Sequence, residues 1–289
     1  MDQFLLDIDT KTWQLPATRQ EWIDALEEGK VLHFPHLAFA LEEQERQYLR
    51  ADVLDPKSRN ISLDANGRLK GAVEDAATVA GLSAMMGRFR SNAEALIHSL
   101  LPEYVPSLRM APTSYRPTVV ESRTQSWRAD DKRLHVDAFP SRPNYGERIL
   151  RVFTNINPAG VPRVWRVGEP FPVVAEQFLP RCKPYVAWQA KMLAALHVTK
   201  SLRSEYDHLM LQLHDGMKGD LDYQKSSAQV TVPFASGSTW VCFSDQTSHA
   251  AMSGQFMLEQ TMHLPAAAQY NPEKSPLAIL SKMAGHQLV

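Results

Sequence analysis

Residues 133–139 read RLHVDAF and place a histidine and a carboxylate two positions apart, at His135 and Asp137. Side chains at positions i and i+2 of an extended strand project to the same face. One imidazole nitrogen and one carboxylate oxygen can therefore converge on a single point. A second histidine, His249, lies in the run GSTWVCFSDQTSHAAMSG at residues 237–254, after a strand-like segment. We expect these three side chains to meet in the folded chain.

Two histidines and one carboxylate form the facial triad of non-haem iron(II) oxygenases. Neutral imidazoles and one carboxylate hold the metal on one side, and the opposite positions stay open for a bidentate 2-oxo acid and for dioxygen. Cysteine ligands would favour zinc or iron–sulfur chemistry instead. The pattern therefore predicts that His135, Asp137 and His249 are metal ligands and catalytic residues. His263 on the last predicted strand is the alternative second histidine, and a hydrogen-bonded loop histidine is the non-functional alternative for His135.

Short strand-like segments separated by Gly and Pro turns predict a mainly β barrel or sandwich with flanking helices. Residues 1–110 form a mostly helical flank, with helices over 17–28, 40–50 and 73–100 and a hairpin over 57–72. Residues 113–265 form the β core, with a helical insertion at about 183–213. The core strands are expected at 148–157, 163–167, 228–234, 238–244 and 256–264. With no linker or repeat, residues 1–289 are predicted to form a single domain.

The composition is that of an ordinary globular protein, with 44% hydrophobic and 22% charged residues and a formal net charge of −1. This balance argues against a globally basic nucleic-acid-binding protein. The two cysteines, Cys182 and Cys242, have neither metal-binding nor redox spacing. The first residues lack the features of a signal peptide, and no apolar stretch is long enough to span a bilayer. We therefore expect a cytoplasmic protein.

Three blocks of the sequence, residues 126–143, 146–171 and 244–261, resemble the 3-deoxy-D-manno-oct-2-ulosonic acid (Kdo) hydroxylase family. The resemblance extends over most of the chain. It implies a double-stranded β-helix core of the jelly-roll or cupin type. It also implies an iron(II)- and 2-oxoglutarate-dependent dioxygenase, with O2 as cosubstrate. The implied reaction is hydroxylation at carbon 3 of a Kdo sugar on lipid A, a modification of lipopolysaccharide.

The sequence departs from the wider dioxygenase superfamily after the distal histidine. An arginine that pairs with the far carboxylate of 2-oxoglutarate is usual about ten positions beyond that histidine, and here Leu258, Glu259 and Gln260 occupy the region. A carboxylate is best bound by a guanidinium. Alternation along 148–157 puts Arg151 on the barrel face. Arg148 then points outward, toward the substrate. The predicted cofactor-binding residues are Arg151, as the anchor, and Asn155, Arg148 and Gln260.

Basic residues are concentrated between residues 115 and 170, a stretch that contains ten Lys and Arg residues and six Asp and Glu residues. This local excess suits an anionic partner, and Kdo carries a carboxylate while lipid A carries phosphates. The predicted substrate-binding residues are Arg128, Arg133, Arg142 and Arg163. Exposed arginines also predict peripheral attachment to the cytosolic face of the inner membrane. No nucleic-acid partner is expected, since the chain has no recognised binding motif.

Two other functions remain open from the sequence. The same cofactors could serve a reaction on a protein side chain or a small metabolite. Alternatively, the chain could be a non-catalytic barrel that binds anionic lipopolysaccharide. An open basic groove would favour the glycolipid over a protein side chain or a small metabolite as the substrate. Metal dependence would exclude the non-catalytic barrel.

Overall fold

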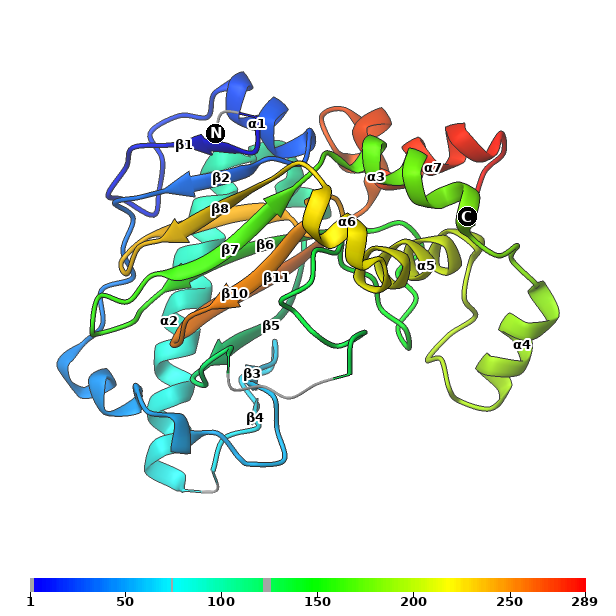
Figure 1. Cartoon of the computed structure of the whole chain (residues 1–289). Coiled ribbons are helices and arrows are strands. Elements are labelled where there is room, and N and C mark those ends of the chain that lie inside the picture. The colour runs from blue at the N-terminus through cyan, green and yellow to red at the C-terminus, as the bar shows by residue number, and fades with distance from the viewer. Residues whose placement is uncertain (1–2, 74, 122–125) are drawn as a thin grey trace.

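Two β-sheets face one another in the computed structural model, which describes residues 3–73, 75–121 and 126–289 (Figure 1). The larger sheet has the order β1-β2-β9-β6-β11-β5-β3-β4, and the smaller has the order β10-β7-β8. The strands of the larger sheet are β1 (Leu5–Asp7), β2 (Val31–Phe34), β9 (Thr239–Phe243), β6 (Arg148–Asn155), β11 (Met257–Leu264), β5 (Arg109–Arg116), β3 (Ile61–Leu63) and β4 (Leu69–Lys70). Those of the smaller sheet are β10 (His249–Ser253), β7 (Arg163–Gly168) and β8 (Gln229–Phe234).

Aromatic side chains fill the space between the two sheets. The Phe234 and Trp240 rings stack with their centroids 4.1 Å apart, and Trp165 meets both rings edge-on. Phe153 stacks on the other side of Trp240. Inward-facing side chains of two sheets that interdigitate in this way form the core of a β-sandwich. The predicted jelly-roll core is confirmed.

A long helix, α2 (Ala76–Leu100), crosses the outer face of the larger sheet (Figure 1). Asp75 caps it, because its carboxylate accepts a hydrogen bond from the backbone N–H of Thr78 at 2.8 Å. Buried side chains of α2, among them Met85 and Phe89, join the largest apolar cluster. The shorter α1 (Gln20–Glu27) packs nearby on β2. Helices α1 and α2 therefore cover the outer face of the larger sheet, and its inner face is turned toward the smaller sheet (Figure 1).

Four helices lie between β7 and β8, namely α3 (Phe171–Phe178), α4 (Ala187–Ala195), α5 (Glu205–Gly219) and α6 (Leu221–Ser226). The helical insertion predicted at 183–213 is thus longer than expected and is divided. Ser204 begins α5 with a capping box, in which its hydroxyl accepts from the Asp207 N–H and the Asp207 carboxylate accepts from the Ser204 N–H. The final helix is α7 (Pro276–Ala284). None of the helices described is long and apolar enough to cross a membrane.

Several elements differ from the prediction. The flank 1–110 contributes β1 and β2 to the edge of the larger sheet, and residues 40–50 hold a short 3-10 helix in place of an α-helix. Strands β5 and β10 and helix α7 were not predicted. The 3-10 helices are Glu43–Tyr48, Ala51–Val53, Pro102–Ser107, Leu179–Arg181, Ala266–Ala268 and Pro272–Lys274.

Candidate active site

The structure brings His135, Asp137 and His249 together at the inner side of the smaller sheet. A β-bridge joins the two histidines, with the His135 N–H donating to the His249 carbonyl at 3.0 Å and the reverse bond at 2.9 Å. One ligand atom from each of the three residues lies within 4.8 Å of the other two. Val136 between them is buried on the opposite side, in another apolar cluster. The two-residue spacing therefore places the side chains as the strand geometry predicts.

Backbone carbonyls fix the orientation of both imidazole rings. Nδ1 of His135 lies 2.7 Å from the carbonyl oxygen of Arg133, and Nδ1 of His249 lies 2.8 Å from that of Thr247. A carbonyl only accepts, so each Nδ1 carries the proton and each Nε2 keeps its lone pair. Burial, together with the neighbouring His135, lowers the pKa of His249 to about 4. Both rings thus present Nε2 toward the metal position, and the His249 ring is neutral.

Asp137 supplies the negative charge of the cluster. Its Oδ2 forms an ion pair with Nη2 of Arg151 at 3.0 Å, and its Oδ1 lies 3.6 Å from Nε2 of His135. Burial alone would raise the pKa of Asp137, but Arg151 and the two imidazoles hold it well below the ordinary value. Two imidazoles that present Nε2 and one ionised carboxylate, with one face open, fit iron(II).

A cavity of about 280 Å³ opens in front of these three residues. Phe153 and Trp165 form part of its wall, and the Trp165 ring stacks on that of His249 with their centroids 5.1 Å apart. Four arginines and three carboxylates also line it: Arg59, Arg116, Arg151, Arg163, Asp131, Asp137 and Glu259. A divalent cation would add to this excess of positive charge, so the cavity suits a dianion.

Glu259 lies in the cavity between two arginines. Its Oε1 is 3.0 Å from Nη1 of Arg151, and its Oε2 is 3.0 Å from Nη2 of Arg116. Burial would raise the pKa of Glu259, but the two guanidinium groups lower it below the ordinary value. Arg151, Glu259 and Arg116 come from the adjacent strands β6, β11 and β5. Glu259 therefore faces inward as a neutralised carboxylate.

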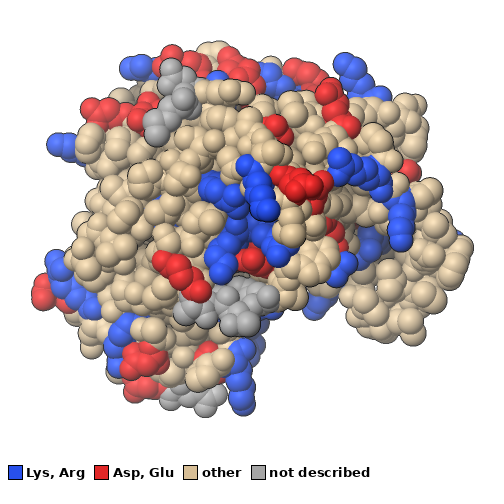
Figure 2. Space-filling model, in the orientation of Figure 1, with Lys and Arg blue, Asp and Glu red and all other residues tan. Residues whose placement is uncertain are grey.

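A wider groove of about 670 Å³ continues outward from the cavity. The two hollows share Asn60, Arg116, Arg151 and Glu259 as lining residues. The outer part of the groove is lined by Arg109 and by the segment 139–144, among others. Lys and Arg side chains gather around the middle of the face drawn in Figure 2. The arrangement provides a basic, open path to the metal ligands.

The predicted cofactor residues fall in different places. Arg151 and Phe153 both line the cavity, as the predicted alternation requires. Asn155 lies further along β6, where its side chain donates to the carbonyls of Val161 and Phe234 at 3.0 and 3.1 Å. Gln260 points to the opposite face of β11 from Glu259 and is completely buried. Neither amide is among the described residues that line the cavity.

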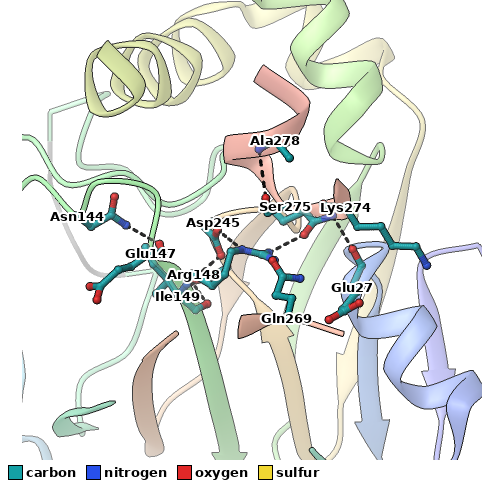
Figure 3. Close-up of polar contacts among 12 residues, drawn as sticks. Glu27, Asn144, Glu147, Arg148, Ile149, Asp245, Gln269, Lys274, Ser275 and Ala278 are labelled. Atoms are coloured by element: carbon teal, nitrogen blue, oxygen red, sulfur yellow. Dashed lines mark hydrogen bonds and ion pairs between the residues drawn. The ribbon is translucent and has the colours of Figure 1, made fainter. Parts of the chain in front are cut away.

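Arg148 corrects one expectation. It lies on the outer face of β6, as predicted, but that face is covered and the side chain is completely buried. Figure 3 shows it between Asp245 and Gln269: its Nε donates to Asp245 at 2.7 Å and its Nη1 to Gln269 at 2.6 Å. Its Nη2 donates to Gln246 at 2.6 Å. Arg148 has no exposed atom to offer a substrate, because the segment after β11 folds over it.

The four predicted substrate arginines also separate. Arg163 lines the inner cavity and Arg142 lines the outer groove. Arg128 is paired with Asp215 at 2.9 Å, and Arg133 donates to the Lys218 carbonyl at 2.7 Å. Neither Arg128 nor Arg133 is among the described residues that line the cavity or the groove. Arg123, which contributes to the basic excess of the sequence, lies outside the described residues.

Three residues near the site were missed from the sequence. Arg116 was counted only as part of the basic cluster, because strand β5, which carries it, was not predicted. Trp165 is both buried in the core and part of the cavity wall. The ring centroid of His214, on α5, lies 5.4 Å from that of His135. The sequence contains no signal that predicts this long-range contact between His214 and His135.

A jelly-roll barrel whose inner face gathers two histidines and an aspartate beside a basic cavity belongs to the 2-oxoglutarate-dependent non-haem iron dioxygenases. Two solved structures of the Kdo hydroxylase KdoO, described as a non-haem Fe(II) α-ketoglutarate-dependent dioxygenase, resemble this chain. One is a complex with α-ketoglutarate and Fe(III), with a TM-score of 0.94, and the other a complex with cobalt(II), with a TM-score of 0.95. Each is 44% identical, over 99% of this chain and 97% of that chain.

The family model of 3-deoxy-D-manno-oct-2-ulosonic acid (Kdo) hydroxylase matches residues 9–287. This chain therefore belongs to the Kdo hydroxylase family. A third KdoO structure, with succinate and Fe(III), is 45% identical with a TM-score of 0.93. No curated protein matches the chain.

Proposed function

We propose that this chain hydroxylates carbon 3 of a Kdo sugar on Kdo-lipid A, using iron(II), 2-oxoglutarate and O2. The observation that carries the proposal is the cluster of His135, Asp137 and His249 at the base of an arginine-lined cavity. Membership of the Kdo hydroxylase family supports the sugar. The complexes of KdoO with α-ketoglutarate and with succinate support the cosubstrate.

His135, Asp137 and His249 would hold the metal through their Nε2 and carboxylate oxygen atoms. Iron(II) with 2-oxoglutarate supplies, when bound, the activation of O2 needed to hydroxylate a carbon–hydrogen bond. The carbonyls of Arg133 and Thr247 keep both rings in the ligating tautomer. Arg151 holds the Asp137 carboxylate ionised and in place. Phe153 and Trp165 keep part of the cavity wall apolar and limit the entry of water on that side.

Arg151 is our candidate for the anchor of the far carboxylate of 2-oxoglutarate. It lies in the cavity, 3.0 Å from the ligand Asp137, and is therefore within reach of a cosubstrate that chelates the same metal. Glu259 shares its charge with Arg116, so Arg151 is not fully engaged by that carboxylate. A guanidinium binds a carboxylate through two parallel hydrogen bonds. Arg163 lines the same cavity and is the comparison for this role.

The outer groove is our candidate for the sugar and its anionic neighbours. Arg142 and Arg109 line it, and it meets the cavity at Arg116 and Arg151. An anionic sugar can therefore occupy the groove while one of its carbons reaches toward the metal ligands. The carboxylate of Kdo and the phosphates of lipid A are suitable partners for guanidinium groups. Arg128 and Arg133 stand outside this path, so we assign them a weaker role.

A lipid-linked substrate implies that the reaction occurs at a membrane surface. We propose peripheral attachment on the cytosolic side of the inner membrane, held by basic side chains. Each Lys or Arg near an anionic surface contributes about 1 kcal/mol. Salt should release the bound fraction, and recovery by detergent alone would contradict electrostatic attachment.

The decisive experiment is succinate release from 2-oxoglutarate with iron(II) and Kdo-lipid A, followed by mass spectrometry of the lipid. We expect a mass gain of one oxygen atom on the Kdo unit. Asp137→Ala is the control and should give neither product. Succinate release with unmodified lipid would point to a protein or metabolite substrate. Lipid binding without metal dependence would point to a non-catalytic barrel.

A further inference from the structure

Helix α4 and its flanking segments, residues 183–203, form a lobe that we call the α4 arm. The arm projects from the side of the molecule beyond α5 (Figure 1). The lobe at the right of Figure 2, where the arm lies, shows mainly uncharged surface. The active-site argument above makes no use of this part of the chain.

Large apolar side chains of the arm face solvent. Trp188, Met192 and Leu196 are 64%, 45% and 66% exposed, and their four-residue spacing places them along one side of the helix. Val198 and Leu202 continue the apolar surface at 55% and 45% exposure. A helix that exposes such a stripe is typical of a surface that contacts a membrane or a partner.

The charge of the arm favours an anionic surface. Residues 183–203 contain Lys183, Lys191, Lys200 and Arg203, and no Asp or Glu. The three lysines are exposed. Basic side chains next to exposed Trp and Leu are characteristic of helices that lie in the interface of membranes with anionic lipids. A second protein chain would need a matching acidic and apolar surface.

Both ends of the arm are fixed to the body of the protein. At one end, the Lys183 N–H donates to Gln212 on α5 at 2.7 Å, and the Gln212 amide donates back to the Lys183 carbonyl at 2.8 Å. At the other end, the Lys200 N–H donates to the Ser141 carbonyl at 2.8 Å. Arg203 donates to the Pro140 carbonyl at 2.6 Å. Pro140 and Ser141 line the outer groove, so the arm is attached to the rim of that groove.

We propose that the α4 arm is a membrane-docking element. Its apolar stripe enters the interface of a bilayer, and its lysines pair with anionic headgroups. The attachment to residues 140 and 141 then sets the groove beside the membrane surface, where a lipid-linked sugar is presented. This inference rests on the proposed function for the identity of the substrate. The docking itself depends only on the arm.

The test is sedimentation of the full chain with vesicles of phosphatidylethanolamine and phosphatidylglycerol, compared with vesicles of phosphatidylcholine alone. We expect the wild type to bind the anionic vesicles. The triple variant Trp188→Ser/Met192→Ser/Leu196→Ser should bind them more weakly, by about tenfold or more. Val161→Ser/Leu221→Ser is the matched control, because both residues are exposed apolar side chains outside the arm. Its binding should equal that of the wild type.

Activity measurements separate this inference from the proposed function. The triple variant should hydroxylate a Kdo oligosaccharide that lacks acyl chains as fast as the wild type. On Kdo-lipid A in vesicles it should be about tenfold slower, in step with its weaker binding. If the wild type binds vesicles through the arm but hydroxylates neither substrate, the docking stands and the proposed function fails.

Three results would overturn the docking. The first is a triple variant that binds vesicles as well as the wild type. The second is a wild type that hydroxylates both substrates without binding vesicles. The third is a change from dimer to monomer in sedimentation velocity, with vesicle binding unaffected, which would make the arm a contact between two copies of this chain.

Discussion

Glu259 and Arg151 form an ion pair of 3.0 Å inside the cavity, from the adjacent strands β11 and β6. Glu259 stands ten positions after His249, where a basic residue was expected. The charge arrangement is thus reversed: β11 carries the carboxylate, and its neighbours β6 and β5 carry the guanidinium groups of Arg151 and Arg116. An anion that enters this cavity meets arginines from the flanking strands.

Arg151→Ala should raise the apparent Michaelis constant for 2-oxoglutarate. A charge-assisted hydrogen bond contributes about 1.5–3 kcal/mol, which corresponds to roughly 10–100-fold in affinity. Steady-state kinetics would measure the change. Cobalt(II) binding should weaken less than in His249→Ala, because all three ligands are retained although Asp137 loses its ion pair. Arg163→Ala is the comparison from the same cavity. If Arg163→Ala raises the constant and Arg151→Ala leaves it unchanged, the anchor is Arg163.

Glu259→Gln should destabilise the protein at neutral pH, because it leaves Arg116 and Arg151 with less compensation in a buried site. The folded-state pKa of Glu259 lies below its ordinary value of 4.5, so its ionised form stabilises the fold above that pH. This stabilisation is lost as the pH falls through the folded-state pKa. Urea unfolding at several pH values should therefore show the gap between wild type and variant closing in acid. A gap that widens in acid would contradict the assignment.

His249→Ala should abolish cobalt(II) binding and succinate release while the fold remains intact. The ring contributes one of the three ligand positions, and two remaining side chains hold a divalent metal poorly. Isothermal titration calorimetry would report the metal, and circular dichroism the fold. His263→Ala on β11 is the matched control, since His263 stands outside the described ligand cluster. Retained turnover in His249→Ala would transfer the assignment to another histidine.

Arg148→Ala should affect stability and leave the affinity for 2-oxoglutarate unchanged. The substitution removes a buried guanidinium and leaves Asp245 without its partner at 2.7 Å. Breaking a buried pair in this way costs about 3–5 kcal/mol. Denaturant unfolding measures the loss, and Arg50→Ala, which removes an exposed pair with Asp52, should cost less than about 1 kcal/mol. A raised 2-oxoglutarate constant at unchanged stability would restore Arg148 to the cofactor site.

The sequence predicted the local geometry of the site better than its long-range contacts. The spacing of His135 and Asp137, and the phase of Arg151 on its strand, follow from the two-residue period of a strand. Which face of β6 is covered depends on the segment after β11, so the environment of Arg148 could not be predicted. The buried amides of Asn155 and Gln260 look like ligands in sequence, yet they hydrogen-bond to the protein.

The missed strands have local causes. Strand β5 has the sequence RMAPTSYR, which contains Pro112 and lacks a clear alternation of apolar and polar residues, so its β pattern is weak. Strand β10 begins at His249 itself and has only five residues, HAAMS, two of them alanine. Both are held by pairing with stronger neighbours: β5 with β11, and β10 with β7. Pairing with neighbouring strands therefore outweighed the weak local β preference of β5 and β10.

The buried group around Arg148 also sets an order of events during synthesis. Arg148 needs Gln269, and the carboxylate of Glu27 accepts hydrogen bonds from the amides of Tyr270 and Asn271 at 2.8 and 2.9 Å. Early segments of a chain leave the ribosome first. Until residues 269–271 emerge, two charged side chains must stay hydrated, and this face of the larger sheet cannot close. Its completion is therefore one of the last steps of folding, whichever strands have paired before.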